Sequence, residues 1–178
     1  DFIGTQPVPE KSDEAGTIQV PNTWRDLFEA EGVLRLFFQV YRTTSPSTAK
    51  IALQCLTQVA SVRRSVFTGT SEREDFLTEL MRGVADIIRT GTGLNDPINH
   101  HELCRLLARM KANFQLKQII KCPVYNDWIV LMANFTTKSF QAWNWAPNSV
   151  YYLLSLWSRL VSSIAYLQAN EDTKLEIL

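Results

Sequence analysis

The two histidines at positions 100 and 101 give this chain its closest approach to a catalytic motif. The stretch reads His100-His101-Glu-Leu-Cys104, and a zinc helix of the HExxH type would carry a second histidine four residues after the first. Arg105 stands at that position after His101. His101 and Cys104 could share one helical face, but zinc sites in proteins use three or four protein ligands. The spacing therefore predicts a surface histidine pair and a buried cysteine, without a metal.

Other motifs that mark catalytic sites are missing from the sequence. It contains no GxSxG nucleophile turn, no P-loop and no glycine-rich phosphate-binding turn. Carboxylates are plentiful, but no pair is marked out by its spacing. We therefore expect no enzyme activity, no catalytic residue and no cofactor. A metal-dependent enzyme built around His100, His101 and Cys104 is kept as an alternative, which a zinc assay on the purified chain would test.

A row of basic side chains offers a binding surface instead. His101, Arg105 and Arg109 follow one another at four-residue spacing, so a helix stacks them in one stripe. Arg63 and Arg64 are expected to end the comparable helix one repeat earlier, and Arg159 to lie on the polar side of the helix one repeat later. The predicted basic strip comprises Arg63, Arg64, His101, Arg105, Arg109 and Arg159. Such a strip could meet an acidic partner surface, although a solvated face without a partner is the simpler alternative.

The charge of the chain limits the class of partner. Its 178 residues carry a formal net charge of zero, which argues against general nucleic-acid binding because no overall positive charge displaces counterions from phosphates. The charge is nevertheless uneven. Residues 32–121 hold thirteen basic and seven acidic side chains, whereas residues 122–170 hold three charged side chains in all. A basic middle segment beside a nearly uncharged one favours a protein partner.

The cysteines and the N-terminus point to the cellular context. Three cysteines are an odd number, widely spaced in apolar surroundings, which is typical of reduced thiols in an intracellular protein. The sequence starts at Asp1, without a methionine or a basic-then-apolar signal. We interpret the chain as a piece of a longer intracellular protein.

Start and stop signals divide most of the chain into helices. Thr23 with Asp26, and Ser71 with Glu74, have the spacing of capping boxes, and Asp96 precedes a proline as a helix cap. Strand-like alternation is nearly absent. The predicted helices lie at about 23–30, 32–42, 46–66, 72–89, 97–112, 114–121, 124–142 and 148–168.

The stretch 143–167 is apolar and aromatic enough to raise the question of a membrane span or an aromatic ligand box. Serines and Arg159 occupy one side of its helix, and an arginine at a bilayer centre costs at least about 2.5–3.5 kcal/mol. Trp143 and Trp145 precede the predicted helix cap Asn148, and Trp157 lies about three turns further on. Aromatic residues at helical spacing usually belong to the core, which argues against a ligand box. We predict one helix buried along a single apolar face. That face comprises Val150, Leu153, Leu154, Trp157, Leu160, Val161, Ile164 and Leu167.

A repeat of helix, turn and helix sets the fold class. Cys55, Cys104 and Leu153 lie about 49 residues apart, each in the inner helix of a hairpin, and this spacing is typical of HEAT repeats. We predict an all-α fold, a right-handed α-solenoid of three to four HEAT-type hairpins. The predicted organisation is a single segment over 1–178, with a flexible loop at 5–21 and hairpins at about 23–66, 72–121 and 124–168.

Four stretches of the sequence resemble a known family. They read IQVPNTWRDLF, QVASVRRSVF, HHELCRLLARMKANFQL and WAPNSVYYLLSLWSRLVSSIAYL. They are similar to the exportin-7 family, the Ran-binding protein 16/17 branch of the importin-β (karyopherin) superfamily, and the likeness covers nearly the whole chain. It implies a segment from the N-terminal half of a longer HEAT superhelix, downstream of the principal Ran-binding repeats.

The resemblance also implies a function. Receptors of this superfamily bind protein cargo together with Ran-GTP, pass the nuclear pore and shuttle between nucleus and cytoplasm. We therefore expect a fragment of a nuclear export receptor whose partners, through the full-length chain, are cargo, Ran-GTP and nuclear pore proteins, without direct nucleic-acid binding or membrane insertion. The alternative is a general HEAT-repeat scaffold without Ran dependence, because the repeat pattern alone does not separate the two. The basic strip is assigned by its charge and spacing, not by the resemblance.

Overall fold

Helices make up almost all of the part of the chain that can be described. The computed structural model describes residues 18–29, 32–141 and 146–175. Its helices are α1 (Arg25–Glu29), α2 (Gly32–Thr43), α3 (Pro46–Val59), α4 (Thr70–Thr90), α5 (Pro97–Asn113), α6 (Leu116–Lys121), α7 (Tyr125–Phe140) and α8 (Pro147–Leu175), with single 3-10 turns η1 (Asn22–Trp24) and η2 (Arg64–Val66). In these described ranges the only strand-like pairing is an isolated parallel bridge between Ile18 and Val62.

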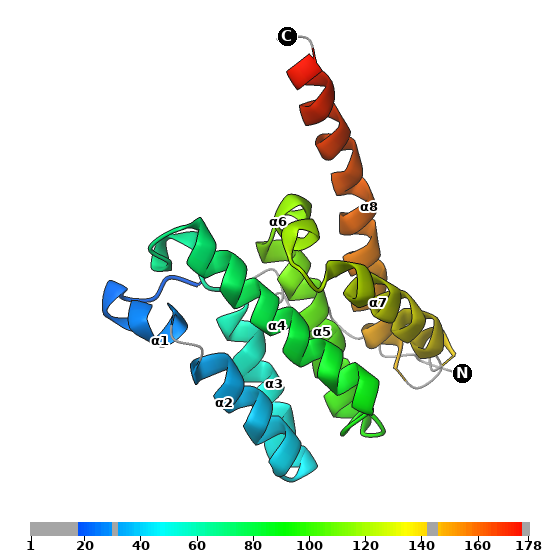
Figure 1. Cartoon of the computed structure of the whole chain (residues 1–178). Coiled ribbons are helices and arrows are strands. Elements are labelled where there is room, and N and C mark those ends of the chain that lie inside the picture. The colour runs from blue at the N-terminus through cyan, green and yellow to red at the C-terminus, as the bar shows by residue number, and fades with distance from the viewer. Residues whose placement is uncertain (1–17, 30–31, 142–145, 176–178) are drawn as a thin grey trace, which may run out of the picture.

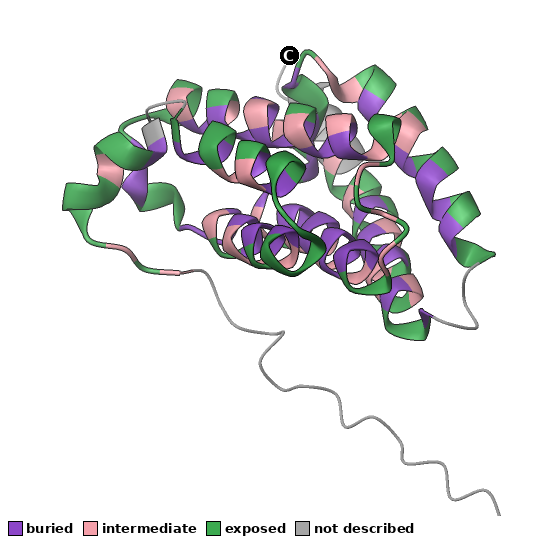
Figure 2. Ribbon diagram, turned by 90° about the horizontal axis from the view of Figure 1, so that it is seen from below, coloured by how far each residue is buried: buried purple, intermediate pink, exposed green. Residues whose placement is uncertain are grey.

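The helices form two layers. Helices α3, α5 and α8 pack side by side in one layer, which we call the inner layer, and α2, α4 and α7 form the outer layer in front of it in Figure 1. Each helix turns its buried side toward the other layer (Figure 2). Paired helices stacked in this way are the architecture of HEAT solenoids, in which each hairpin buries the face of the next. The predicted all-α, HEAT-type fold is confirmed.

Buried rows across the inner layer show the repeat in the core. Leu53, Leu103 and Leu153 are each 0% exposed and recur every fifty residues, one on each inner helix. The same spacing relates Leu56 to Leu106 and Leu156, and Ala60 to Met110 and Leu160, all of them buried. The register is thus fifty residues at these positions and not the 49 predicted from Cys55 and Cys104. Consistent with that shift, Cys104 is buried while Cys55 is only half-buried.

The helix predicted over 46–66 ends earlier. Helix α3 stops at Val59, and the chain then bonds to the segment before α1: the amide of Ile18 donates to the carbonyl of Ser61 at 2.8 Å, and the amide of Arg63 donates to the carbonyl of Ile18 at 3.1 Å. This long-range pairing replaces the last helical hydrogen bonds. The prediction that Arg63 and Arg64 end this helix is therefore wrong, because both residues follow it.

Capping signals were correct at one helix and wrong at two. The carboxylate of Asp96 accepts hydrogen bonds from the amides of Ile98 and Asn99, as predicted. Helix α4 instead begins at Thr70, after Gly69, and has no side-chain cap bond because glycine has no side chain to form one. Thr23 belongs to η1, which also lacks a side-chain cap bond. A capping box that we did not predict joins Gln115 and Gln118 at α6.

Helix α8 is longer than predicted and buries only part of its apolar side. It continues to Leu175 and projects beyond the rest of the fold (Figure 1). Leu153 and Leu160 are buried, but Leu154 is 52% and Val161 62% exposed. The single buried face predicted for this helix is therefore wrong, because its apolar side is wider than the surface that α5 and α7 cover. No helix in the described ranges is long and apolar enough to cross a membrane. Trp143, Trp145 and most of the predicted 5–21 loop lie outside the described residues.

Candidate functional site

The basic strip lies along the inner layer, and its α5 members are half-buried between neighbouring helices. His101, Arg105 and Arg109 occupy one side of α5, as their four-residue spacing predicts. Each has a partner within the fold. The Nδ1 atom of His101 is 3.3 Å from the Ser149 hydroxyl of α8, and the Nε of Arg109 donates a short hydrogen bond to the Ser61 hydroxyl after α3. Both side chains thus tie α5 to adjacent repeats.

Arg105 has an acidic neighbour that the strip prediction missed. Its Nη1 is 3.5 Å from Oε2 of Glu102, a buried carboxylate one turn earlier on α5. The other oxygen, Oε1, accepts a hydrogen bond of 2.7 Å from the Gln54 amide of α3. A buried carboxylate needs such partners, since leaving it unpaired costs several kcal/mol. Glu102 therefore offsets one positive charge of the strip and also joins α3 to α5. Its three-residue distance from Arg105 was the available sequence signal.

The strip is most open at its two ends. Arg63 and Arg64 are exposed after α3, where the Nη2 of Arg64 lies 3.3 Å from the Thr70 hydroxyl at the start of α4. Arg159 is exposed on α8. Between the ends, a further cation escaped prediction: Lys111 of α5 is 7% exposed. Burial lowers the pKa of Lys111, and the nearby charge of Arg159 lowers it further. The structure thus brings α5 and α8 cations into electrostatic reach of one another.

The histidine–cysteine stretch forms a structural contact. His100 is buried, not on the surface as predicted, and its Nε2 is 3.0 Å from the Ser139 hydroxyl of α7. Its Nδ1 lies 3.9 Å from the Cys104 sulfur. Burial lowers the pKa of His100 and raises that of Cys104, so both side chains favour their uncharged forms. In the described part of the chain no three histidine, cysteine or acidic side chains converge as metal ligands do.

A buried arginine outside the strip also serves packing. The guanidinium of Arg73 on α4 lies over the Phe114 ring, 4.6 Å from its centroid, and near that of Phe67. Its Nη2 donates to the carbonyl of Asn113 at 3.0 Å. Burial lowers the pKa of Arg73. Stacked between two rings, Arg73 fixes the start of α4 against the end of α5 and offers no surface to a partner.

Comparison with known proteins identifies relatives over nearly the whole chain. It is 48% identical over 99% of its length to Exportin-7-A of Xenopus laevis, 47% identical over 96% to Ran-binding protein 16 of Drosophila melanogaster, and 44% identical over 99% to Ran-binding protein 17 of Homo sapiens. The chain spans 15–16% of the length of these relatives. Neither a protein-family model nor a solved structure matches it. The resemblance to the exportin-7 family is confirmed.

Proposed function

We propose that this chain is one segment of a karyopherin-type nuclear export receptor, which binds protein cargo and Ran-GTP cooperatively and carries the cargo through the nuclear pore to the cytoplasm. The observation that carries the proposal is the high identity, over nearly all of the chain, to proteins named for export and for Ran binding. The two-layer HEAT fold is compatible with it. In such a receptor the segment shuttles between nucleus and cytoplasm and meets pore proteins as part of the longer chain.

The proposed mechanism is linkage through a flexible stack. Small rotations between neighbouring hairpins add up along a solenoid, so a ligand that favours one curvature changes the affinity for a second ligand elsewhere. Side-chain bonds across the inner layer, such as Gln54 to Glu102 and Arg109 to Ser61, set the angle between adjacent repeats in this segment. They are the contacts through which a change in curvature passes from α3 to α5.

An exposed side of α8 supports a place inside a longer stack. Cys104 and Lys111 are buried on α5. The positions fifty residues later, on α8, are Leu154 and Val161, and both are exposed. On α5 this side packs against α8. We therefore assign the same side of α8 to the first helix pair that follows in the longer polypeptide. With this assignment, residues 1–178 are proposed to be a single segment of a longer solenoid.

The basic strip is the proposed cargo-facing surface of the segment. Its open ends, Arg63, Arg64 and Arg159, are exposed and positively charged, and they can approach acidic groups of a folded protein. The half-buried members between them hold the inner helices in place. Direct contact between this segment and Ran is not part of the proposal.

The decisive experiment uses a longer polypeptide that includes this segment and extends over the full length of its relatives, of which the segment spans 15–16%. Its affinity for Ran is measured with Ran loaded with GTP and with GDP. A strong preference for the GTP form is expected, since cooperative loading in the nucleus requires it. Equal or absent binding would overturn the transport proposal and favour a general HEAT-repeat scaffold whose partners bind without regard to nucleotide.

A further inference from the structure

The joint between α5 and α8 repeats the joint between α3 and α5, but with different chemistry. Across the first joint, Arg109 of α5 donates to the hydroxyl of Ser61. Fifty residues later, the register of the buried rows places Lys111 where Ser61 stands and Arg159 where Arg109 stands. The first joint therefore pairs an arginine with a hydrogen-bond acceptor, whereas the equivalent positions of the second joint hold an arginine and a second cation. The two positions are comparable because α5 packs against both α3 and α8.

No acidic group in the described part of the chain neutralises this pair. The ion pairs in that part involve other cations, and none includes Lys111 or Arg159. The hydroxyls of Ser162 and Ser163, further along the same helix, donate to main-chain carbonyls and bring no negative charge to the pair. Two like charges, one of them buried, repel each other and destabilise the fold unless an anion lies between them.

We infer that Lys111 and Arg159 form a seat at the α5/α8 joint for a carboxylate of an acidic protein partner. A carboxylate suits the pair because its two oxygens can bind the planar guanidinium and the ammonium at once. A protein partner fits better than a polyanion because the chain has no net positive charge. Exposed Tyr151, the residue before the half-buried Tyr152 that packs on His101, also provides apolar contact area on this helix.

This inference rests on the proposed use of the basic strip as a partner surface, and narrows it to one joint. Strip members on α5 already have oxygen partners inside the fold, as Arg105 has in Glu102. No ion pair among the described residues involves Lys111 or Arg159, so a carboxylate that binds between them would neutralise their charges without breaking one. The lowered pKa of Lys111 agrees with this unsatisfied arrangement.

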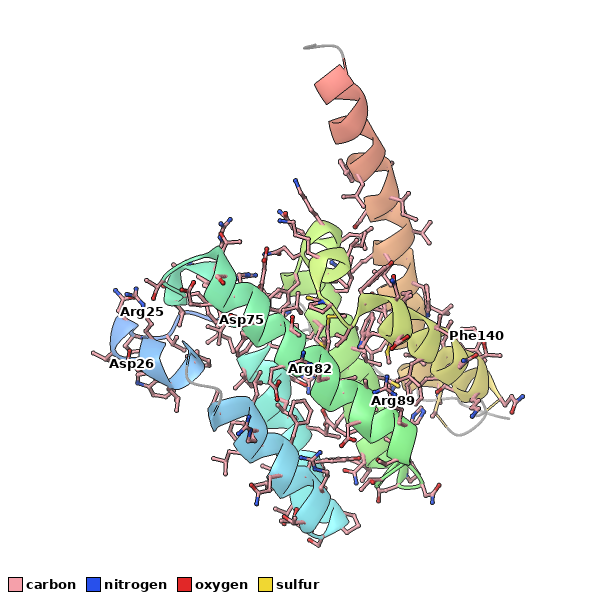
Figure 3. All side chains as sticks on the ribbon, viewed as in Figure 1. Arg25, Asp26, Asp75, Arg82, Arg89 and Phe140 are labelled. Carbon is pink, nitrogen blue, oxygen red and sulfur yellow. The ribbon has the colours of Figure 1, made fainter. Side chains whose placement is uncertain are left out.

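The test is calorimetric titration of the purified chain with a short glutamate-rich peptide. Arg159→Ser is the main variant because Arg159 is exposed and its loss leaves the core intact. The matched control is Arg89→Ser, which removes a charge that is also exposed, from α4 in the outer layer (Figure 3). Arg159→Ser should weaken peptide binding roughly tenfold or more, as expected for loss of a close charge pair, whereas the control stays near the wild type. Equal peptide affinity of the wild type and both variants would overturn the inference that Lys111 and Arg159 bind a carboxylate.

A second measurement needs no ligand. If the two cations repel each other, Lys111→Ser and Arg159→Ser should each raise the melting temperature at low salt, and the double variant should gain less than the sum of the two. Additive effects, or loss of stability in Arg159→Ser, would overturn the inference. If inorganic phosphate displaces the peptide at a lower concentration than free glutamate does, the site prefers phosphate, and the inference of a carboxylate ligand is overturned.

Failure of the seat and failure of the transport proposal are separable. The Ran-GTP preference of the longer polypeptide is measured without the glutamate-rich peptide. A preserved preference together with unchanged peptide binding in Arg159→Ser would overturn the seat alone. Loss of the preference together with weakened peptide binding in the variant would overturn transport and support the seat on a scaffold protein.

Discussion

The ring of Phe38 on α2 lies directly against the bare Cα of Gly83 on α4. A Cβ added at Gly83 would come within 2.2 Å of the ring, closer than any real contact. Phe38 itself is buried. The missing side chain of one residue therefore makes room for the ring of the other, and this contact brings neighbouring outer helices together.

Gly83→Ala should destabilise the chain. Alanine favours a helix over glycine by up to about 1 kcal/mol, but forcing a methyl into the Phe38 ring costs about 1–3 kcal/mol through displaced packing, so the net effect is a loss. Urea unfolding measures it. Gly32→Ala, where nothing lies within 4 Å of the added Cβ, is the control and should not lose stability. Adding Phe38→Leu to Gly83→Ala should recover part of the loss, and a stable single variant would contradict the close contact.

Local signals accounted for the helices, whereas contacts between distant segments did not follow from them. Helix α5 was predicted at 97–112 and runs over Pro97–Asn113, because proline and Asp96 mark its start and its apolar residues keep helical spacing. The end of α3 was missed because no glycine or proline stops it; the pairing of Ile18 with Val62 does. That pairing joins residues far apart in sequence.

The candidate site was predicted in composition but not in environment. Charge and spacing identified Arg105 and Arg109, yet their partners Glu102 and Ser61 depend on how neighbouring inner helices align. A shift of the repeat register from 49 to fifty residues moves every such pairing by one position. Lys111 gave no signal at all, because its burial results from α5 packing against α8.

Reversing both Arg105 and Arg109 to glutamate should destabilise the fold, contrary to what an exposed stripe would predict. Glutamate at 105 would face the buried Glu102, and glutamate at 109 would lose the bond to Ser61. Loss of hydrogen bonds to charged groups costs about 1.5–3 kcal/mol each. Thermal unfolding followed by circular dichroism measures the change.

Arg159→Glu is the matched charge reversal at an exposed position of the same strip, and it should not lower the melting temperature. A double variant at 105 and 109 as stable as the wild type would show that the α5 side chains are free surface groups. Binding assays with protein partners should therefore use substitutions at Arg159 or Arg64, whose effects are not mixed with unfolding.

Trp157 should contribute through both packing and a hydrogen bond. Its side chain is half-buried against the core, and its Nε1 donates to the Thr136 hydroxyl of α7 at 2.9 Å. Trp157→Ala should cost about 3 kcal/mol, the low end of the range for large aromatic truncations, because part of the ring is exposed. Trp157→Phe keeps most of the packing and should cost about 0.5–1.5 kcal/mol, the value of one hydrogen bond. Chemical unfolding that gives equal losses for both variants would contradict this division.

His100 should make the stability of the chain depend on pH below neutrality. Its folded pKa is lowered from the ordinary 6.5 by burial and then by His101, so the unfolded chain binds the proton more readily. The contribution of neutral His100 to the free energy of unfolding is therefore fully present above about pH 6.5. It decreases as the pH falls from there toward the lowered folded pKa. The ring packs against the uncharged side chains of Ser139, Phe135 and Cys104.

Melting temperatures between neutral and mildly acidic pH test this dependence. His100→Gln, which cannot titrate, should flatten the curve in this range, whereas His101→Gln should leave the slope in place because His100 is still present. An unchanged slope in His100→Gln would assign the pH dependence to other groups.

Replacing Leu154 and Val161 together by glutamate distinguishes the exposed side of α8 from its buried side. Both residues are more than half exposed, so the double variant should change the stability of this chain by no more than about 0.5 kcal/mol. Leu153→Ala, one residue away but fully buried, should cost about 2–5 kcal/mol. Urea unfolding of the two variants gives the comparison. In a longer polypeptide the glutamates should become destabilising, because the proposed following hairpin buries them. If the double variant already unfolds this chain as readily as Leu153→Ala does, α8 is buried on both sides, and this side of the helix has no room for a following repeat.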